Sequence, residues 1–240
     1  DMLLPQEALP FPGEGSPPSP TRADDPDQVV YLAFTSGTTG TPKGVMHSAN
    51  TLLANARAMV DDWGHDNDTV LLSFSQLSHH IGTVALDQVL VGGMELVLHD
   101  PAAGIAPIDW IEESGATYVM GVPTHAIDIL AALRRSRRTG LGKLRTFNMA
   151  GAPIPTETAA HLLSLGVKPQ NIYGMTENGS HHYTMPDDDP AVITSTCGKA
   201  CNAYEIKLFD PERLDVEVPH GEIGEIGGRG AMRMLGYFGN

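Results

Sequence analysis

The sequence is poor in cysteine, in aromatic residues and in positive charge. Its 240 residues include two Cys, 6% aromatic residues, and 15 Lys and Arg against 29 Asp and Glu, which gives a formal net charge of −14. Cys197 and Cys201 cannot build a disulfide framework or a four-ligand metal site, so we expect two core thiols. The acid excess argues against a nucleic-acid partner, because phosphate backbones are bound by clustered Lys and Arg.

Long apolar runs are also missing. No stretch approaches 18 apolar residues, and the N-terminus is rich in Pro instead of basic and then apolar. We therefore expect no membrane span and no signal peptide, and a cytoplasmic protein. Residues 1–28 combine Pro with Gly, Ser and Asp and show no apolar period, which predicts a flexible Pro-rich linker.

From residue 29 to residue 185, strand-like and helical segments alternate. The expected strands are at 29–34 (a buried strand), 69–74, 94–98, 116–120, 144–149 and 171–173, and the expected helices at 48–61, 81–91, 107–114, 124–135 and 155–165. Pro107 and Pro155 suit a first helical turn, Thr124 suits an N-cap, and Gly166 suits the position after a helix. This alternation predicts an α/β fold, with a mostly parallel sheet flanked by helices.

The pattern changes after residue 186. Strand-like runs at 192–196, 204–208, 222–226 and 231–235 are separated by turn residues, and glycines become frequent near the end. We expect residues 186–240 to form a small β-rich subdomain.

A Gly-rich polar loop follows the first expected strand. Residues 35–44 read TSGTTGTPKG. Glycines let the backbone approach a ligand closely, and successive N–H groups and hydroxyls can surround a phosphate, to which Lys43 adds a positive charge. Gly44 follows the Lys where a Walker A loop has Ser or Thr, so this is a phosphate loop of another kind. The candidate phosphate ligands are Thr35, Ser36, Gly37, Thr38, Thr39, Gly40 and Lys43.

The run TSGTTGTPKG resembles the phosphate-binding signature of the adenylate-forming superfamily, in its acyl- and aryl-CoA synthetase branch. Further matches follow in the order of that family: AGAP at residues 150–153, YGMTE at 173–177, and GEIGEI at 221–226 with Gly236 and Tyr237 beyond it. Four ordered matches are far more specific than a lone motif. The resemblance implies that this chain is a central fragment of the family's large N-terminal domain.

The resemblance also implies a nucleotide site. The ring of Tyr173 would stack on adenine, whose other face would lie against Gly151, Ala152 and Pro153, beside Gly174. Thr176 would donate its hydroxyl to the α-phosphate, and Glu177 would hold Mg²⁺ together with phosphate oxygens.

An acid pocket is implied beside it. His79 begins an H-x-x-G match and would orient the substrate carboxylate. Candidates for an apolar wall are Val122, Gly174 and Met175, together with Val119, Met120 and Gly121. His80 is expected to be structural. Relatives that activate amino acids have an Asp near His79, so its absence favours a simple carboxylic acid. A zinc site at His181 and His182 is not expected, because no third ligand has suitable spacing.

The implied activity is ATP-dependent activation of a fatty or aryl acid to an acyl-adenylate and then to a CoA thioester. Lys43, Thr176, Glu177 and His79 would be the catalytic residues, and ATP/AMP, Mg²⁺ and coenzyme A the cofactors. Two alternatives stay open: a carrier-protein thiol as the acceptor, and a nucleotide-binding module without turnover. The family's next motif and its C-terminal lid domain would lie beyond Asn240, so we expect the 240 residues alone to be inactive or nearly so.

Overall fold

The structure, a computed structural model, describes residues 25–35, 42–202 and 204–239. Its centre is a seven-stranded sheet in which five parallel strands are followed by two antiparallel ones. In spatial order the strands are β4 (Glu95–Leu98), β3 (Val70–Ser73), β5 (Tyr118–Gly121), β6 (Thr146–Met149), β7 (Lys168–Met175), β8 (Gly179–Tyr183) and β9 (Lys199–Ala200). The predicted α/β fold with a mostly parallel sheet is confirmed.

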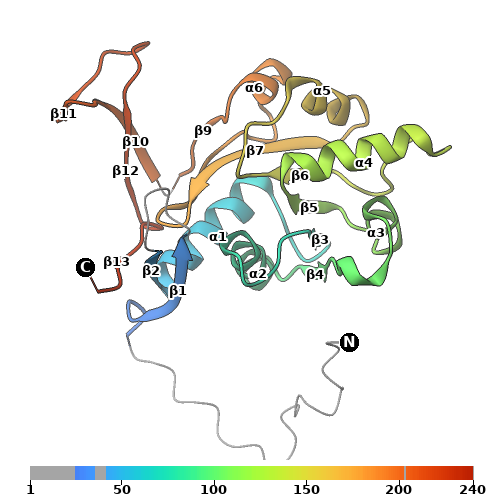
Figure 1. The fold of residues 1–240 in the computed structure, drawn as a ribbon, viewed down its shortest axis with the longest axis horizontal. Coiled ribbons are helices and arrows are strands. Elements are labelled where there is room, and N and C mark those ends of the chain that lie inside the picture. Colours follow the sequence, from blue (N-terminus) through green and yellow to red (C-terminus); the bar gives the residue numbers. More distant parts are fainter. Residues whose placement is uncertain (1–24, 36–41, 203, 240) are drawn as a thin grey trace, which may run out of the picture.

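Helices cover both faces of this sheet (Figure 1). One face carries α1 (Ala49–Trp63) and α2 (His80–Gly92), and the other carries α3 (Pro107–Glu113), α4 (Pro123–Arg135) and α5 (Thr156–Ser164). Neighbouring strand residues point to opposite faces, so Leu71 packs in the α1–α2 core and Leu72 in the α3–α5 core. A short 3₁₀ helix, η2 (Pro101–Ala103), follows β4. No helix in the described ranges is long and apolar enough to cross a bilayer.

Helix ends follow local chemistry, with two corrections. Pro155, expected in a first helical turn, directly precedes α5 as its N-cap. The Ser48 side chain accepts from Thr51 N–H and caps α1, and Gly166 follows α5 with φ of 76°, as expected. Thr124 is not an N-cap, so that prediction is wrong. Pro123 occupies the first turn of α4, which makes Val122 the cap, because proline has its φ pre-set for that position.

The expected buried strand at the start of the chain is exposed instead. β1 (Val29–Thr35) pairs antiparallel with β2 (Lys43–Ser48), a strand the sequence pattern did not reveal, and β13 (Gly236–Tyr237) flanks β2 on its other side. Val30 is 53% and Phe34 68% exposed. The connection of residues 36–42 is too short for the crossover that parallel strands need, so the chain turns back as a hairpin.

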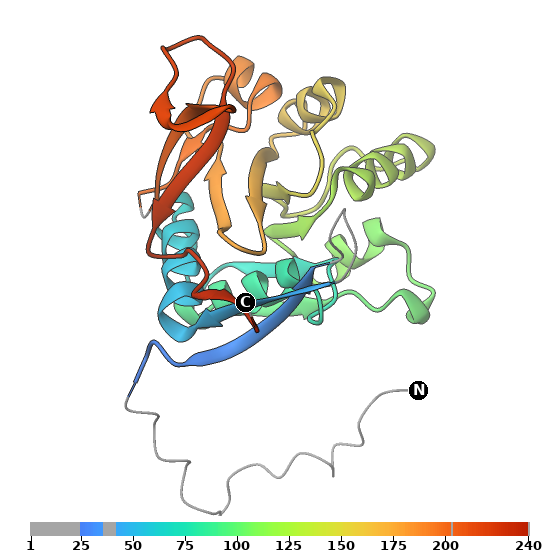
Figure 2. The ribbon, with the colours of Figure 1, turned by 60° about the vertical axis from the view of Figure 1, so that its left-hand side comes forward.

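The C-terminal part contains one helix and a small antiparallel sheet. Residues 190–195 form α6 (Pro190–Ser195) and not the expected strand, because the Asp189 side chain caps the helix and Pro190 starts it. β10 (Tyr204–Asp210), β11 (Arg213–Glu217) and β12 (Glu225–Gly230) form a sheet in the order β11-β10-β12 (Figure 2). The expected strand at 231–235 is a turn. β12 contains the glycines at 228 and 230, and it begins and ends a few residues after the strand expected at 222–226.

Two short strands cross the boundary expected at residue 186. β9 extends the central sheet through β8, and β13 returns to β2. The last residues of the chain therefore lie beside the strand that carries Lys43.

Candidate functional site

The loop after β6 and the C-terminal half of β7 border a cavity at the carboxyl ends of parallel strands. Its volume is about 700 Å³, and the residues on its wall come from this loop, from β7 and from the end of α6: Gly151, Ala152, Pro153, Asn171, Tyr173, Gly174 and Thr196 among them. Gly151 has φ of 86°, a backbone conformation that favours glycine. The structure thus brings together two motif segments that are separated by about twenty residues of sequence, at the edge where open α/β sheets bind ligands.

Tyr173 is half-buried on the wall of this cavity. Its ring meets the ring of His181 edge-on, with centroids 5.4 Å apart and planes at 87°. His181 in turn stacks on Tyr204 at 4.6 Å. These ring contacts restrict the orientation of the Tyr173 side chain.

A second cavity, of about 150 Å³, adjoins the first. Both are lined by Gly151, Ile172 and Gly174, and the smaller one adds His79, His80, Ile81, Val84, Met175 and Thr176. Gly174 and Met175 therefore lie where an acid-pocket wall was expected. Val122, the third expected wall residue, lines neither cavity, since it is the N-cap of α4. Val119 packs in the α3–α5 core, on the opposite face of the sheet.

His79 lies at the mouth of the smaller cavity and caps α2. Its Nδ1 accepts the Ile81 N–H at 3.3 Å, so a neutral His79 carries its proton on Nε2. That nitrogen is then a donor, as a group that binds a carboxylate must be. His79 also lines a neighbouring cavity of about 260 Å³, bounded by β1 and by Thr176.

A cluster of three rings connects the β1–β2 hairpin to α2. The His80 ring stacks on Tyr31, at 5.9 Å, and on His47, at 5.5 Å, and Tyr31 lies 6.3 Å from His47, so the three ring centres form a triangle. Burial lowers the pKa of His80 to about 4 and also lowers the pKa of His47, so both rings are neutral at pH 7. His47 Nε2–H donates to the Thr176 carbonyl at 2.7 Å. Sequence reasoning missed Tyr31 and His47 and expected only a structural role for His80, because no local pattern signals such contacts.

Lys43, Glu177 and Tyr237 form a cluster that joins three motifs. The Tyr237 hydroxyl donates to Glu177 Oε1 at 2.9 Å, and Lys43 Nζ lies 5.0 Å from the centre of the Tyr237 ring. Backbone bonds fix the cluster, since Met234 N–H donates to the Glu177 carbonyl and Phe238 N–H to the Gly44 carbonyl, both at 2.7 Å. Tyr237 was noted in the sequence only as part of a motif, without a role.

The remaining predicted ligands divide into two groups. Thr35 ends β1, and Lys43 begins β2, so both flank the loop. Ser36, Gly37, Thr38, Thr39 and Gly40 lie outside the described residues. Within the described residues there is no group of three or more His, Cys, Asp or Glu side chains that could hold a metal ion. A cation at this site would therefore depend on Glu177 and on oxygens of a bound ligand.

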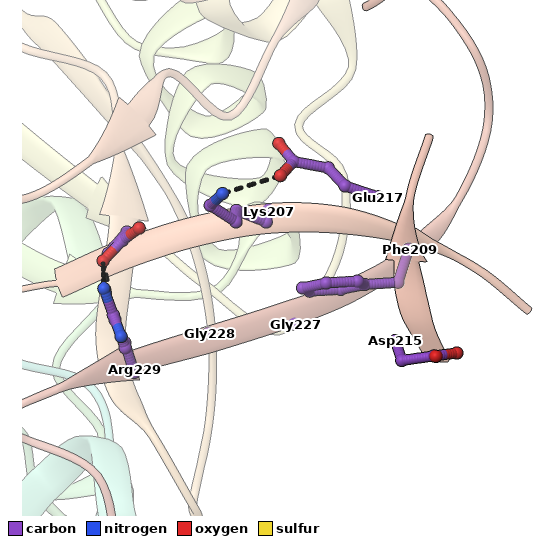
Figure 3. Close-up of a pocket in the computed structure, with 8 residues that line it drawn as sticks. Lys207, Phe209, Asp215, Glu217, Gly227, Gly228 and Arg229 are labelled. Carbon is purple, nitrogen blue, oxygen red and sulfur yellow. Dashed lines mark hydrogen bonds and ion pairs between the residues drawn. The ribbon is translucent and has the colours of Figure 1, made fainter. Parts of the chain in front are cut away.

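A further cavity, of about 570 Å³, lies on the β10–β11–β12 sheet, where β12 continues from the GEIGEI motif (Figure 3). Lys207 pairs with Glu217 at 2.6 Å and Arg229 with Glu205 at 2.7 Å. The Phe209 ring lies against Gly227, where a side chain would collide with it. The two cations are already paired, and no predicted site residue lines this surface.

The model of the AMP-binding enzyme family matches residues 2–238. This chain belongs to the AMP-binding enzyme family. The match confirms the resemblance seen in the motifs, and it spans the described cavities as well as the Lys43–Tyr237–Glu177 cluster.

Two relatives and one solved structure are similar to this chain over most of its length. The medium-chain fatty-acid–CoA ligase of Escherichia coli K12 is 31% identical over 213 residues, 88% of this chain and 37% of the ligase. The feruloyl-CoA synthase of an Amycolatopsis species is 33% identical over 215 residues, 89% of this chain and 43% of the synthase. The crystal structure of apo MatB from Rhodopseudomonas palustris superposes with a TM-score of 0.76 at 29% identity, over 89% of this chain and 41% of MatB. The chain thus spans about two fifths of the length of these relatives.

Proposed function

We propose that the protein carrying this chain activates a carboxylic acid with ATP, first to an acyl-adenylate and then to a CoA thioester. The observation that carries the proposal is the meeting of a large and a small cavity at Gly174, beside the Lys43–Tyr237–Glu177 cluster. A two-substrate reaction needs such adjacent compartments, because holding the reactants together removes much of the entropic barrier. A cytoplasmic location is part of this proposal.

Each compartment receives one part of the substrates. The adenine enters the 700 Å³ cavity against Tyr173 and the backbone of Gly151. The acid enters the 150 Å³ cavity with its carboxylate toward His79 Nε2–H. A carboxylate oxygen attacks the α-phosphorus, the bond to the bridging oxygen breaks, and pyrophosphate leaves. In the second step the CoA thiol attacks the acyl carbon and AMP leaves.

Lys43 and Thr176 flank the position where negative charge develops. The Lys43 ammonium is held over Tyr237, and the backbone of Thr176 is held by His47. Such preorganised donors stabilise the transition state more than the ground state. The Tyr237 hydroxyl donates to Glu177 Oε1. The other carboxylate oxygen, Oε2, accepts no hydrogen bond from the described residues. Oε2 could therefore coordinate a Mg²⁺ ion. When bound, the ion would neutralise charge on the phosphate oxygens.

ATP–pyrophosphate exchange in the full-length protein, with a panel of aliphatic and aromatic acids, tests the proposal. We expect exchange with at least one acid, and Lys43→Ala is expected to lower it by well over about 10-fold, because a charge at the reacting phosphate is lost. Lys143→Ala, at an exposed loop position, is the matched control. Absence of exchange with every acid would leave a nucleotide-binding module and overturn the proposal. Offering preformed adenylate to CoA and to a carrier protein identifies the acceptor thiol.

Tyr237→Phe tests the cluster itself. The change removes the hydroxyl that donates to Glu177 and keeps the ring under Lys43. A hydrogen bond to a charged group contributes roughly 1.5–3 kcal/mol, so exchange is expected to fall by about 10-fold or more. Phe238→Leu, at the exposed neighbouring position, is expected to leave the rate near that of the wild type. Equal rates for Tyr237→Phe and the wild type would exclude a role for this bond.

A further inference from the structure

The turn between β7 and β8 carries two residues of the proposed reaction. Thr176 and Glu177 follow the last residue of β7, and β8 begins at Gly179. Thr176 lines the small cavity, and Glu177 accepts the Tyr237 hydroxyl. A site on a turn is precise only when other elements fix the backbone of that turn. Where Thr176 and Glu177 point therefore depends on what holds this segment.

His47 holds the first residue of the turn. The His47 ring is buried, and burial lowers its pKa, so the ring is neutral at pH 7 and carries one proton. Nε2 lies 2.7 Å from the Thr176 carbonyl oxygen, which can only accept, so the proton is on Nε2. Nδ1 is then an acceptor, and the Thr51 hydroxyl lies 3.0 Å from it. The ring is thus fixed at both of its nitrogens.

Asn55 holds the other end of the turn. Its Oδ1 accepts the Ser180 N–H at 3.1 Å, and its Nδ2 donates to the Ser180 carbonyl at 3.0 Å. Asn55 is 4% exposed, so these two bonds satisfy an amide that water does not reach. A Cβ at Gly179 would lie 2.7 Å from Asn55 Oδ1, and Gly179 has φ of 63°. Glycine at this position therefore allows the close approach.

The side chains that hold the turn are spaced four residues apart. Thr51 and Asn55 belong to the first two turns of α1, and His47 directly precedes the N-cap of that helix. Residues four apart lie on one face of a helix, so this row of side chains faces the β7–β8 hairpin. α1 packs against β8 and also holds the far end of the hairpin, where Trp63 Nε1–H donates to the Thr184 carbonyl at 3.1 Å.

We propose that His47 and Asn55 are positioning residues of the adenylation step. Together they hold the β7–β8 turn so that Thr176 and Glu177 face the reacting phosphate. The inference rests on the proposed function. Neither His47 nor Asn55 lines the two substrate cavities, so each acts through the backbone of the turn. The proposed adenine wall lies outside the turn, so the two residues serve the chemical step more than the binding of nucleotide.

Steady-state ATP–pyrophosphate exchange in the full-length protein tests the role of His47. His47→Leu removes the donor to the Thr176 carbonyl, and we expect kcat to fall at least about 10-fold while KM for ATP stays within about 3-fold. His47→Gln places an amide donor near the position of Nε2 and should restore kcat to within about 3-fold of the wild type. Equal kcat in a folded His47→Leu variant and in the wild type overturns the inference and leaves the proposed function standing. No exchange by the wild type with any acid overturns the proposed function.

Trp63→Phe is the matched control. It removes another hydrogen bond from α1 to a backbone carbonyl of the same hairpin, at the end away from the turn. We expect a lower melting temperature and, at temperatures well below melting, a kcat within about 3-fold of the wild type. A loss of kcat in Trp63→Phe as large as that in His47→Leu would show that the exchange rate follows stability alone, and would overturn the inference.

Asn55→Leu gives a second, independent test of the same inference. Leu has nearly the shape of Asn, and the change removes both bonds to Ser180. We again expect kcat to fall at least about 10-fold with KM for ATP within about 3-fold of the wild type. Wild-type kcat in a folded Asn55→Leu variant, or a loss confined to KM, contradicts the positioning role. His47→Leu and Asn55→Leu break different backbone bonds, so either variant decides if the other does not fold.

Discussion

Glu177→Gln is expected to lower ATP–pyrophosphate exchange in the full-length protein by at least about 100-fold. The amide oxygen of Gln can still accept the Tyr237 hydroxyl that Glu177 Oε1 accepts at 2.9 Å, so the local structure is preserved. What is lost is the negative charge that would hold a hard cation next to the phosphates. The measurement is the exchange rate as a function of Mg²⁺ concentration.

The Mg²⁺ dependence distinguishes a metal role from a structural one. A variant that has lost a cation ligand should need more Mg²⁺ to reach half of its maximal rate. Glu157→Gln, an exposed carboxylate in the first turn of α5, is the matched control and should behave as the wild type does. Unchanged exchange and unchanged Mg²⁺ dependence in Glu177→Gln would show that this carboxylate holds no cation.

Gly174→Ala is expected to lower folding stability and to weaken the binding of both nucleotide and acid at the site. A Cβ at residue 174 would overlap the carbonyl of Gly179 and lie 3.0 Å from Ser180 Cα. Both are backbone atoms, which cannot move aside as the end of a flexible side chain can. β7 and β8 would have to separate to make room, which costs about 1–3 kcal/mol or more of folding stability. Because Gly174 lines both cavities, the same displacement would deform the nucleotide and acid compartments together.

Thermal unfolding and AMP binding, measured on the same preparation, separate the two consequences. We expect a lower melting temperature and at least about 10-fold weaker AMP binding, since the wall of the larger cavity moves. Gly140→Ala is the control, because a Cβ there meets open space and should change neither quantity. Wild-type AMP affinity in Gly174→Ala would show that the wall tolerates the extra methyl group and that the two compartments are not joined through this residue.

The parallel core and the phosphate-loop motif could be read from local sequence. Leu71 and Leu72, or Val119 and Met120, belong to short apolar runs that supply one residue to each core, which is the pattern of strands buried on both faces. Pro107 at the start of α3 and Gly166 after α5 reflect backbone preferences that depend only on nearest neighbours. Such local signals predicted five helices and the parallel strands.

The errors arose where an adjacent strand, a capping residue or a proline outweighed the propensity of the segment itself. The apolar run of β1 resembles a core strand, yet it forms the exposed side of a hairpin because its partner is β2. Residues 190–195 contain β-branched side chains typical of strands, and the Asp189 cap together with Pro190 outweighed that propensity. Thr124 was expected to cap α4, but Pro123 occupies the first turn of the helix and makes Val122 the cap.

By itself, the sequence determined the chemistry of this protein: which residue types occur, in which motifs, and hence the family to which it belongs. Only the tertiary structure decided how they meet. Lys43, Glu177 and Tyr237 are far apart along the chain and touch because β13 returns to β2. The hold of His47 and Asn55 on the β7–β8 turn likewise exists only because α1 packs against β8. The physical reason is that motifs depend on local backbone preference, whereas a site depends on long-range packing, which no local pattern encodes.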